Sequence, residues 1–293
     1  MFDQILQFLI TGMTTGAIYA LVALGFTIIY NASDVVNFAQ GEFVMMGAMS
    51  TIFLAAGDNG LPIPLAAATS VVLVICVGIL LQRFAIAPAR GASVVTTIII
   101  TIGASIFLRG VALVIWGKDI QAMAHFSGEI PIHIGNATLL PQNLWVMGGT
   151  ALMVLGVHYF FHHTMQGKAI LACSYNRDAA NLMGINVGLM MLVAYGLSAL
   201  LGAMAGILVT PISFTSYDAG VMLGLKGFSA AILGGMGNPM GAVVGGLLLG
   251  LIESLAAGLI SSGYKDAIGF IILLLVLFIR PSGLMGRRSS DRV

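Results

Sequence analysis

The sequence predicts an all-α polytopic integral membrane protein with about eight or nine transmembrane helices. Of its 293 residues, 59% are hydrophobic and only 8% are charged, whereas an ordinary soluble domain carries roughly 25% charged residues. The mean hydropathy is +1.04, and long apolar runs recur along the whole chain. So few charges cannot cover a water-facing surface. This composition excludes soluble enzymes, nucleic-acid-binding modules and disordered proteins.

The apolar runs divide the chain into spans, because a transmembrane helix needs about 20 mostly apolar residues. The predicted spans cover residues 5–30, 34–57, 62–82, 93–115, 143–163, 188–210, 219–236, 239–260 and 265–280. Polar residues and glycines interrupt the second and the seventh, so these are expected to be broken or re-entrant. Broken helices at membrane depth occur only where they are buried in protein or line a cavity. Residues 1–293 are expected to form one transmembrane domain.

Basic residues predict the orientation, because cytoplasmic loops carry an excess of Lys and Arg. If the spans alternate, eight of the twelve basic residues lie on one side: Arg83, Arg90, Lys168, Arg177, Arg280, Arg287, Arg288 and Arg292. Only Lys118 and Lys265 fall in loops on the other side. The first side is therefore expected to be cytoplasmic, with the tail at 281–293. The N-terminus lies outside if all nine spans cross, and inside if one broken segment is re-entrant.

Two loops are long enough to carry structure of their own. The external loop at 117–142 alternates apolar and polar residues around Gly135-Asn136, which predicts a small hairpin. In the inner loop at 164–187, residues 176–184 predict a short cytoplasmic helix. Asn176 suits the N-cap, Asp178 the first turn and Gly184 the C-terminal stop. Without a partner, this helix would be a simple connector.

The chain lacks the residue patterns of common active sites. Its Gly-Lys pairs are not followed by Ser or Thr, so there is no Walker-type phosphate loop. Residues 235–241 have the wrong spacing for a dinucleotide fingerprint, and no HExxH sequence exists. No pair of carboxylates is placed for acid–base chemistry. We therefore expect a protein that is not an enzyme and holds no metal or cofactor.

A polar group stands in the second predicted span. Asn37, Gln40 and Glu42 lie in an otherwise apolar region, where polar groups are costly unless they meet partners or water. The neighbouring Gly41 permits a backbone break. The segment is either a broken helix that lines a translocation path or a cytoplasmic turn before the span.

Two buried charges are expected to meet in the C-terminal half. Counted along their spans at 1.5 Å per residue, Lys226 and Glu253 lie at similar depth in the bilayer core. A lone charge there costs at least about 2.5–3.5 kcal/mol on insertion scales. Glu253 is therefore expected to pair with Lys226, or with Arg109 as the second candidate. The alternative is that each side chain snorkels separately to the interface.

Three segments occur in this order in one family: Val35 to Phe43, the loop from Gly167-Lys168 to Gly184-Ile185-Asn186, and Lys226 to Asn238. By these segments the chain resembles the LivH-type permeases of bacterial branched-chain amino acid ABC importers. ABC permeases carry a cytoplasmic loop that docks on the ATPase. The coupling residues Asp178, Ala179, Ala180 and Gly184 are similar to the core of that loop, with Asp in place of Glu. The Ile-x-Leu-Pro continuation of many importers is missing.

The resemblance implies a permease subunit that forms half of a translocation pathway in the bacterial inner membrane. The implied partners are a second permease (LivM-type), two ATPase subunits that use ATP, and an external or periplasmic amino-acid-binding protein. Membrane lipid surrounds the complex, and nucleic acid has no role. Asn37, Gln40, Glu42, Lys226 and Glu253 are the candidate pathway residues. Open alternatives are another amino acid, amide or urea-like substrate, or a stand-alone secondary transporter.

Overall fold

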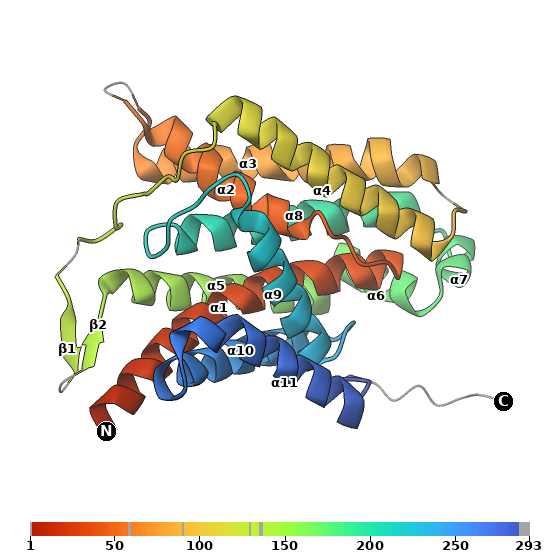
Figure 1. The fold of residues 1–293 in the computed structure, drawn as a ribbon. Helices are drawn as coiled ribbons and strands as arrows, with labels where there is room; N and C mark the ends of the chain where they lie inside the picture. Colours follow the sequence, from red (N-terminus) through yellow and green to blue (C-terminus); the bar gives the residue numbers. More distant parts are fainter. Residues whose placement is uncertain (1, 58–59, 90, 129, 135–136, 287–293) are drawn as a thin grey trace.

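The computed structural model describes residues 2–57, 60–89, 91–128, 130–134 and 137–286, and nearly all of its ordered elements are helices (Figure 1). Within these ranges, seven helices are long and apolar enough to cross a membrane. They are α1 (Phe2–Ser33), α3 (Ile63–Leu81, continued by two irregular turns to Ala89), α4 (Val94–Trp116), α5 (Pro141–His163), α8 (Val187–Val209), α10 (Pro239–Leu259) and α11 (Lys265–Ile279, with one turn before it from Ser262).

The second and seventh predicted spans are the short ones. Helices α2 (Gln40–Ala55) and α9 (Ala219–Gly234) have 16 residues each. At 1.5 Å per residue each reaches about 24 Å, less than the roughly 30 Å of a bilayer core. The predicted eight or nine spans are therefore seven full helices and these two shorter ones. Helix α2 begins after the polar segment that interrupts the second predicted span, whereas α9 runs unbroken through Lys226 and Gly227.

The long helices run back and forth between two ends of the bundle, which Figure 1 shows at its left and right, whereas the shorter α9 crosses them. A small antiparallel hairpin, β1 (Ile132–Ile134) and β2 (Ala137–Leu139), lies at the left end beside the start of α1. There Gln7 accepts a hydrogen bond of 2.8 Å from the Thr138 amide. The hairpin prediction is confirmed, although its Gly135-Asn136 turn lies outside the described residues.

The right end holds α6 (Met165–Tyr175) and α7 (Arg177–Leu182) (Figure 1). Helix α7 confirms the predicted short helix: the Asn176 side chain accepts from the Ala179 amide at 2.9 Å, and Gly184 adopts φ +85°. Helix α6 was not expected. It begins because the Thr164 hydroxyl accepts from the Gly167 amide, a cap that a threonine before an apolar run could have indicated.

The predicted basic side is partly visible in this arrangement. Arg83 and Asn186 line one crevice, so the α3–α4 connection meets the start of α8 at the α7 end. The segment after Arg280 pairs with the end of α9, since the Leu284 amide donates to the Leu233 carbonyl. Arg90, Arg287, Arg288 and Arg292 lie outside the described residues.

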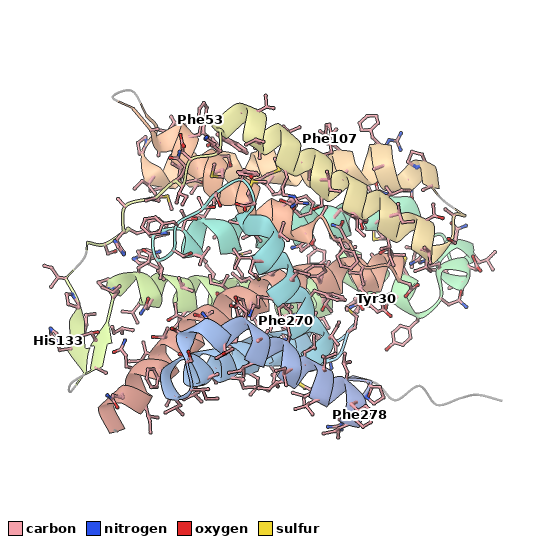
Figure 2. All side chains as sticks on the ribbon, in the orientation of Figure 1. Tyr30, Phe53, Phe107, His133, Phe270 and Phe278 are labelled. Carbon is pink, nitrogen blue, oxygen red and sulfur yellow. The ribbon has the colours of Figure 1, made fainter. Side chains whose placement is uncertain are left out.

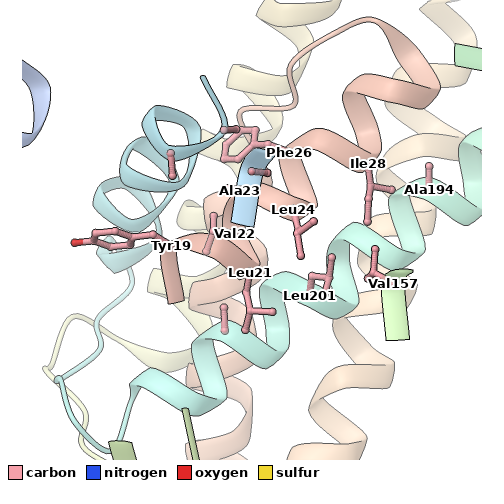
Figure 3. Close-up of a cluster of buried hydrophobic side chains, with 14 of the residues drawn as sticks. Tyr19, Leu21, Val22, Ala23, Leu24, Phe26, Ile28, Val157, Ala194 and Leu201 are labelled. Atoms are coloured by element: carbon pink, nitrogen blue, oxygen red, sulfur yellow. The ribbon is translucent and has the colours of Figure 1, made fainter. Parts of the chain in front are cut away.

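Helix α1 is the centre of the core, and most of its length is enclosed by other helices. Leu21, Leu24 and Ile28 face side chains of α5 and α8, among them Val157 and Leu201 (Figure 3). The outer surface is apolar as well: Phe107 of α4 and Phe278 of α11 project away from the bundle (Figure 2). An apolar exterior around an apolar core is expected for a protein whose solvent is lipid.

Glycines allow α1 and α10 to pack backbone to backbone, the most extensive helix contact in the structure. A Cβ atom added at Gly16 would lie 2.8 Å from the Leu247 Cα, and one at Gly250 would fall on the Gly16 backbone. The Gly-xxx-Gly spacings at Gly12/Gly16 and Gly246/Gly250 therefore form the close helix contact that such spacings favour in membranes.

We expect Gly250→Ala to destabilise the folded protein by about 1–3 kcal/mol, because its methyl group overpacks a backbone contact. Gly148→Ala on α5 is the matched control, since no atom lies within 4 Å of the added Cβ. The measurement is the midpoint of thermal loss of monodisperse protein in detergent. Equal midpoints for the two variants would contradict this account of the α1–α10 contact.

Candidate functional site

The chain turns back into the bundle between α1 and α2. Asp34 leaves α1 with φ +52°, and its amide still donates to the Tyr30 carbonyl at 2.7 Å. Asn37 then accepts from the Ala39 amide at 3.2 Å, a local turn that asparagine favours. The segment 34–39 returns far enough for the Phe38 amide to donate to Thr101 of α4 at 3.2 Å.

Helix α2 consequently begins near the middle of the bundle. The Gln40 amide group donates to the Ser198 carbonyl at 3.2 Å, and Ser198 is the midpoint of α8. The Ser198 hydroxyl bonds both Gln40 and the Gly25 carbonyl of α1. Gln40 is fully buried. It therefore ties the start of α2 to α1 and α8, and the predicted break lies at mid-depth rather than at the bundle end.

Glu42 meets two polar groups from the middle of α4. The Ser105 hydroxyl donates to its Oε1 at 2.7 Å, and the Arg109 Nε lies 3.5 Å from the same oxygen. Ser105 is the midpoint of α4. Only 1% of Glu42 is exposed, against 30% of the Arg109 side chain. Neither Glu42 Oε2 nor Arg109 Nε has a hydrogen-bond partner among the described residues.

A cavity of about 130 Å³ adjoins this charge pair. Phe26, Phe38 and Phe228 form its aromatic side, with the Phe228 ring centroid 5.7 Å from Phe26 and 5.5 Å from Phe38. The aliphatic side chains that line it are Ile102, Val221 and Leu225. The cavity thus combines one carboxylate, one guanidinium and an apolar wall.

The start of α9 closes against the start of α2. A Cβ atom at Gly220 would lie 2.9 Å from Glu42 Oε2, and one at Gly224 would lie 3.1 Å from the Gly41 Cα. The N-termini of the two shorter helices therefore meet beside the cavity. Transporters often build substrate sites where the N-termini of broken helices meet near the bilayer midplane.

Lys226 and Glu253 form a second, separate charge cluster. They are bonded to each other and are 2% and 0% exposed. Tyr19 of α1 donates to Glu253 at 2.9 Å, and Asp266 at the start of α11 lies 2.9 Å from the Lys226 ammonium. Gly269 of α11 leaves space for the Glu253 carboxylate, because a Cβ atom at this position would lie 2.5 Å from Glu253 Oε1. The pairing of Glu253 with Lys226 is confirmed.

The structure places the five candidate pathway residues in three settings. Glu42 lines the cavity, Asn37 and Gln40 hold the backbone break beside it, and Lys226 and Glu253 lie in the second cluster. Arg109, the second candidate partner of Glu253, pairs with Glu42 instead. No sequence pattern had singled out Ser105, Tyr19 or Asp266. Ser105 and Arg109 are four residues apart on one helix face, a spacing that could have indicated a polar stripe.

The coupling candidates lie on the segment that includes α7. Asp178, Ala179 and Gly184 are exposed and Ala180 is buried. Leu182 and Met183 beside them are 88% and 84% exposed. Arg177 bonds Asp34 at 3.0 Å, so α7 is attached to the first residue of the segment that leads to Glu42. A cleft of about 730 Å³ separates α7 from the α3–α4 connection.

Comparison with known proteins identifies the family. The family described as "branched-chain amino acid transport system / permease component" matches residues 8–277. The chain belongs to this family. It is 32% identical to the high-affinity branched-chain amino acid transport system permease protein LivH of Escherichia coli, over 100% of this chain and 99% of LivH. It is also 32% identical to BraD of Pseudomonas aeruginosa, over 98% of both chains.

The family resemblance extends to a permease for another class of solute. The ribose import permease protein RbsC of Escherichia coli is 28% identical over 90% of this chain and 89% of RbsC. The expected membership in the LivH-type permeases is thus confirmed, and the chain is a multi-pass membrane protein with the seven long helices described above. Similarity at this level spans both amino acid and sugar carriers.

Proposed function

We propose that this chain is the membrane-spanning permease subunit of an ABC importer for branched-chain amino acids in a bacterial inner membrane. The observation that carries the proposal is the mid-depth junction of α2, α4 and α9, in a chain that is 32% identical over its full length to LivH. The backbone break, the charge pair and the apolar cavity supply part of a path through the bundle. This chain forms half of that path.

The second half comes from another permease subunit at the surface between α4 and α9. Ile102, Val221 and Leu225 are at least one-third exposed there, and the cavity opens between them. Its volume of about 130 Å³ is small beside the roughly 300–1,000 Å³ of complete ligand pockets. A second subunit on this surface would enclose the rest. The subunit composition of the purified complex would tell whether this second subunit is a copy of this chain or a LivM-type relative.

The end with α6 and α7 faces the cytoplasm in this proposal, and the hairpin end faces outward. Arg83, Lys168, Arg177 and Arg280 lie in segments at the α7 end, as the positive-inside rule requires. Two ATPase subunits bind the exposed Leu182–Met183 surface of this chain and its partner. The external loop at 117–142 receives the amino-acid-binding protein. ATP is used on the partner subunits, and no catalytic group or cofactor is assigned to this chain.

The test is reconstitution of the chain with its second permease, the ATPases and the binding protein in proteoliposomes. We expect uptake of radiolabelled leucine, isoleucine or valine. This uptake should require ATP on the side of the membrane that carries the ATPase subunits, and the loaded binding protein on the opposite side. Omission of the binding protein and replacement of ATP by a non-hydrolysable analogue are the controls. Uptake of ribose but of no amino acid would show that the proposed substrate is wrong and that the chain serves a sugar importer. Uptake by this chain alone, driven by an ion gradient, would identify a secondary transporter.

A further inference from the structure

We infer that Glu42 and Arg109 form a substrate subsite that takes the charged ends of a zwitterionic amino acid in transit. The ammonium group bonds Glu42, the carboxylate bonds Arg109, and the branched side chain lies against Phe38 and Phe228. This inference rests on the proposed function and deepens it. It separates the five pathway candidates into one substrate-contacting residue, Glu42, and four others that hold the fold.

The bonding of the pair leaves room for a ligand. A buried carboxylate and guanidinium usually satisfy each other with two parallel hydrogen bonds. Here the Arg109 Nε lies 3.5 Å from Glu42 Oε1 without a hydrogen bond from that atom, and Glu42 Oε2 is unpaired within the described structure. A buried polar atom without a partner is costly, so such atoms call for an explanation such as an absent ligand or water. A substrate ammonium at Oε2 and a carboxylate at the guanidinium would complete both sets of bonds.

The contrast with the Lys226 cluster supports this assignment. Glu253 is bonded by Lys226 and Tyr19, and Lys226 also has Asp266. Lys226 and Glu253 are themselves enclosed, although Asp266 is 56% exposed, and the residues of this cluster line none of the cavities described above. The Glu42 pair borders the cavity and is partly open through Arg109. Of the two charge pairs, the Glu42 pair is thus the one that borders a described cavity, which is the property that a ligand needs.

The cavity chemistry matches an apolar amino acid better than a sugar. A sugar needs many neutral hydrogen-bond partners, whereas the lining offers three phenyl rings, three aliphatic side chains, and polar groups from only Glu42, Ser105 and Arg109. A zwitterion with a branched apolar side chain uses both kinds of surface. Within a family that includes a ribose permease, these residues would select for the amino acid substrate.

The experiment compares neutral variants of the pair in the complete reconstituted importer. Glu42→Gln leaves the partly exposed Arg109 unpaired and Arg109→Gln leaves the buried Glu42 unpaired, so either can fail for structural reasons. The double variant Glu42→Gln/Arg109→Gln leaves no unpaired charge, and a purely structural pair should tolerate it. Arg280→Gln, at an exposed position at the end of α11, is the control for loss of one guanidinium.

We expect the double variant to lower the leucine uptake rate about tenfold to a hundredfold, since it loses two charge-assisted bonds to the substrate. ATPase activity stimulated by the loaded binding protein, measured in the same proteoliposomes, should stay within about twofold of wild type and thereby report assembly. Uptake within about twofold of wild type in the double variant would overturn the subsite, even where the wild-type complex transports leucine. Absence of uptake by the wild-type complex would instead overturn the proposed function.

A second variant covers the case in which the double variant does not assemble. Val221→Phe places a ring at the partly exposed mouth of the cavity without touching a charge. We expect it to slow leucine uptake at least about threefold more than valine uptake, since leucine has the longer side chain and one methylene in an apolar pocket is worth about 10–200-fold. An unchanged leucine-to-valine ratio at the wild-type rate would contradict the assignment of this cavity.

Discussion

Glu253→Lys should leave little folded protein in the membrane. The change sets two ammonium groups against each other at a site where Lys226 and Glu253 are 2% and 0% exposed. Removing one partner of a buried pair costs about 3–5 kcal/mol, and a like charge adds to that cost. The total stability of a typical protein is about 5–15 kcal/mol, so the loss is large. The measurement is the yield of monodisperse protein after detergent extraction, followed by uptake in the reconstituted importer.

The charge-reversed pair should restore much of that yield. Adding Lys226→Glu re-forms the attraction, but the new glutamate faces Asp266, which lies 2.9 Å from the present ammonium. We therefore expect the triple variant with Asp266→Asn to recover more than the double variant. Asp266→Asn alone is the control and should cost at most about 1 kcal/mol, because Asp266 is 56% exposed. A double variant no better than Glu253→Lys, with no gain from Asp266→Asn, would mean that the pair does not stabilise the fold.

Gly184→Pro should separate ATP hydrolysis from uptake. Gly184 ends α7 with φ +85°, and its amide donates to the Asn181 carbonyl at 3.0 Å. Proline cannot adopt that φ and has no amide hydrogen. The substitution should destabilise the end of α7 by about 3 kcal/mol and leave the membrane spans intact. We therefore expect leucine uptake to fall at least about tenfold. The measurement is uptake per ATP hydrolysed in proteoliposomes.

Two further variants locate the coupling route. Asp178→Lys reverses an exposed charge on α7 and should also lower the ratio of uptake to hydrolysis. Arg177→Ala removes the bond to Asp34, the contact between α7 and the segment that leads to Glu42. Gly57→Pro is the control, because Gly57 has φ +83° in the connection between α2 and α3, away from α7. Wild-type coupling in both Gly184→Pro and Asp178→Lys would exclude α7 as the coupling helix.

Local features of the structure followed from short stretches of sequence. The span boundaries, the N-cap at Asn176, the stop at Gly184 and the hairpin each depend on a few consecutive residues. Apolar length, an asparagine before a helix and a glycine after it act through their immediate neighbours. Helix α6 was not predicted because its local signals are weak: its 11 residues are too few for a span, and its cap is a single threonine.

Contacts between distant residues required the tertiary structure. Lys226 and Glu253 are 27 positions apart on consecutive helices, and counting turns placed them at one depth. Depth also left Arg109 as a second candidate partner of Glu253, although Arg109 pairs with Glu42, because depth along a span says nothing about which neighbour a helix faces. Ser105 and Glu42 are separated by 63 positions, and only the packing of α2 against α4 brings them together.

Local sequence was enough to predict that this chain lies in lipid, which stretches form its long helices, and which polar residues need partners, because hydropathy and capping are properties of neighbouring residues. Only the tertiary structure decided how deep the segment 34–39 folds back, and that Glu42 rather than Glu253 borders a cavity. Depth and access depend on how glycines let one backbone approach another, as Gly220 and Gly224 do at the start of α2. Such approaches join parts of the chain that no local pattern connects.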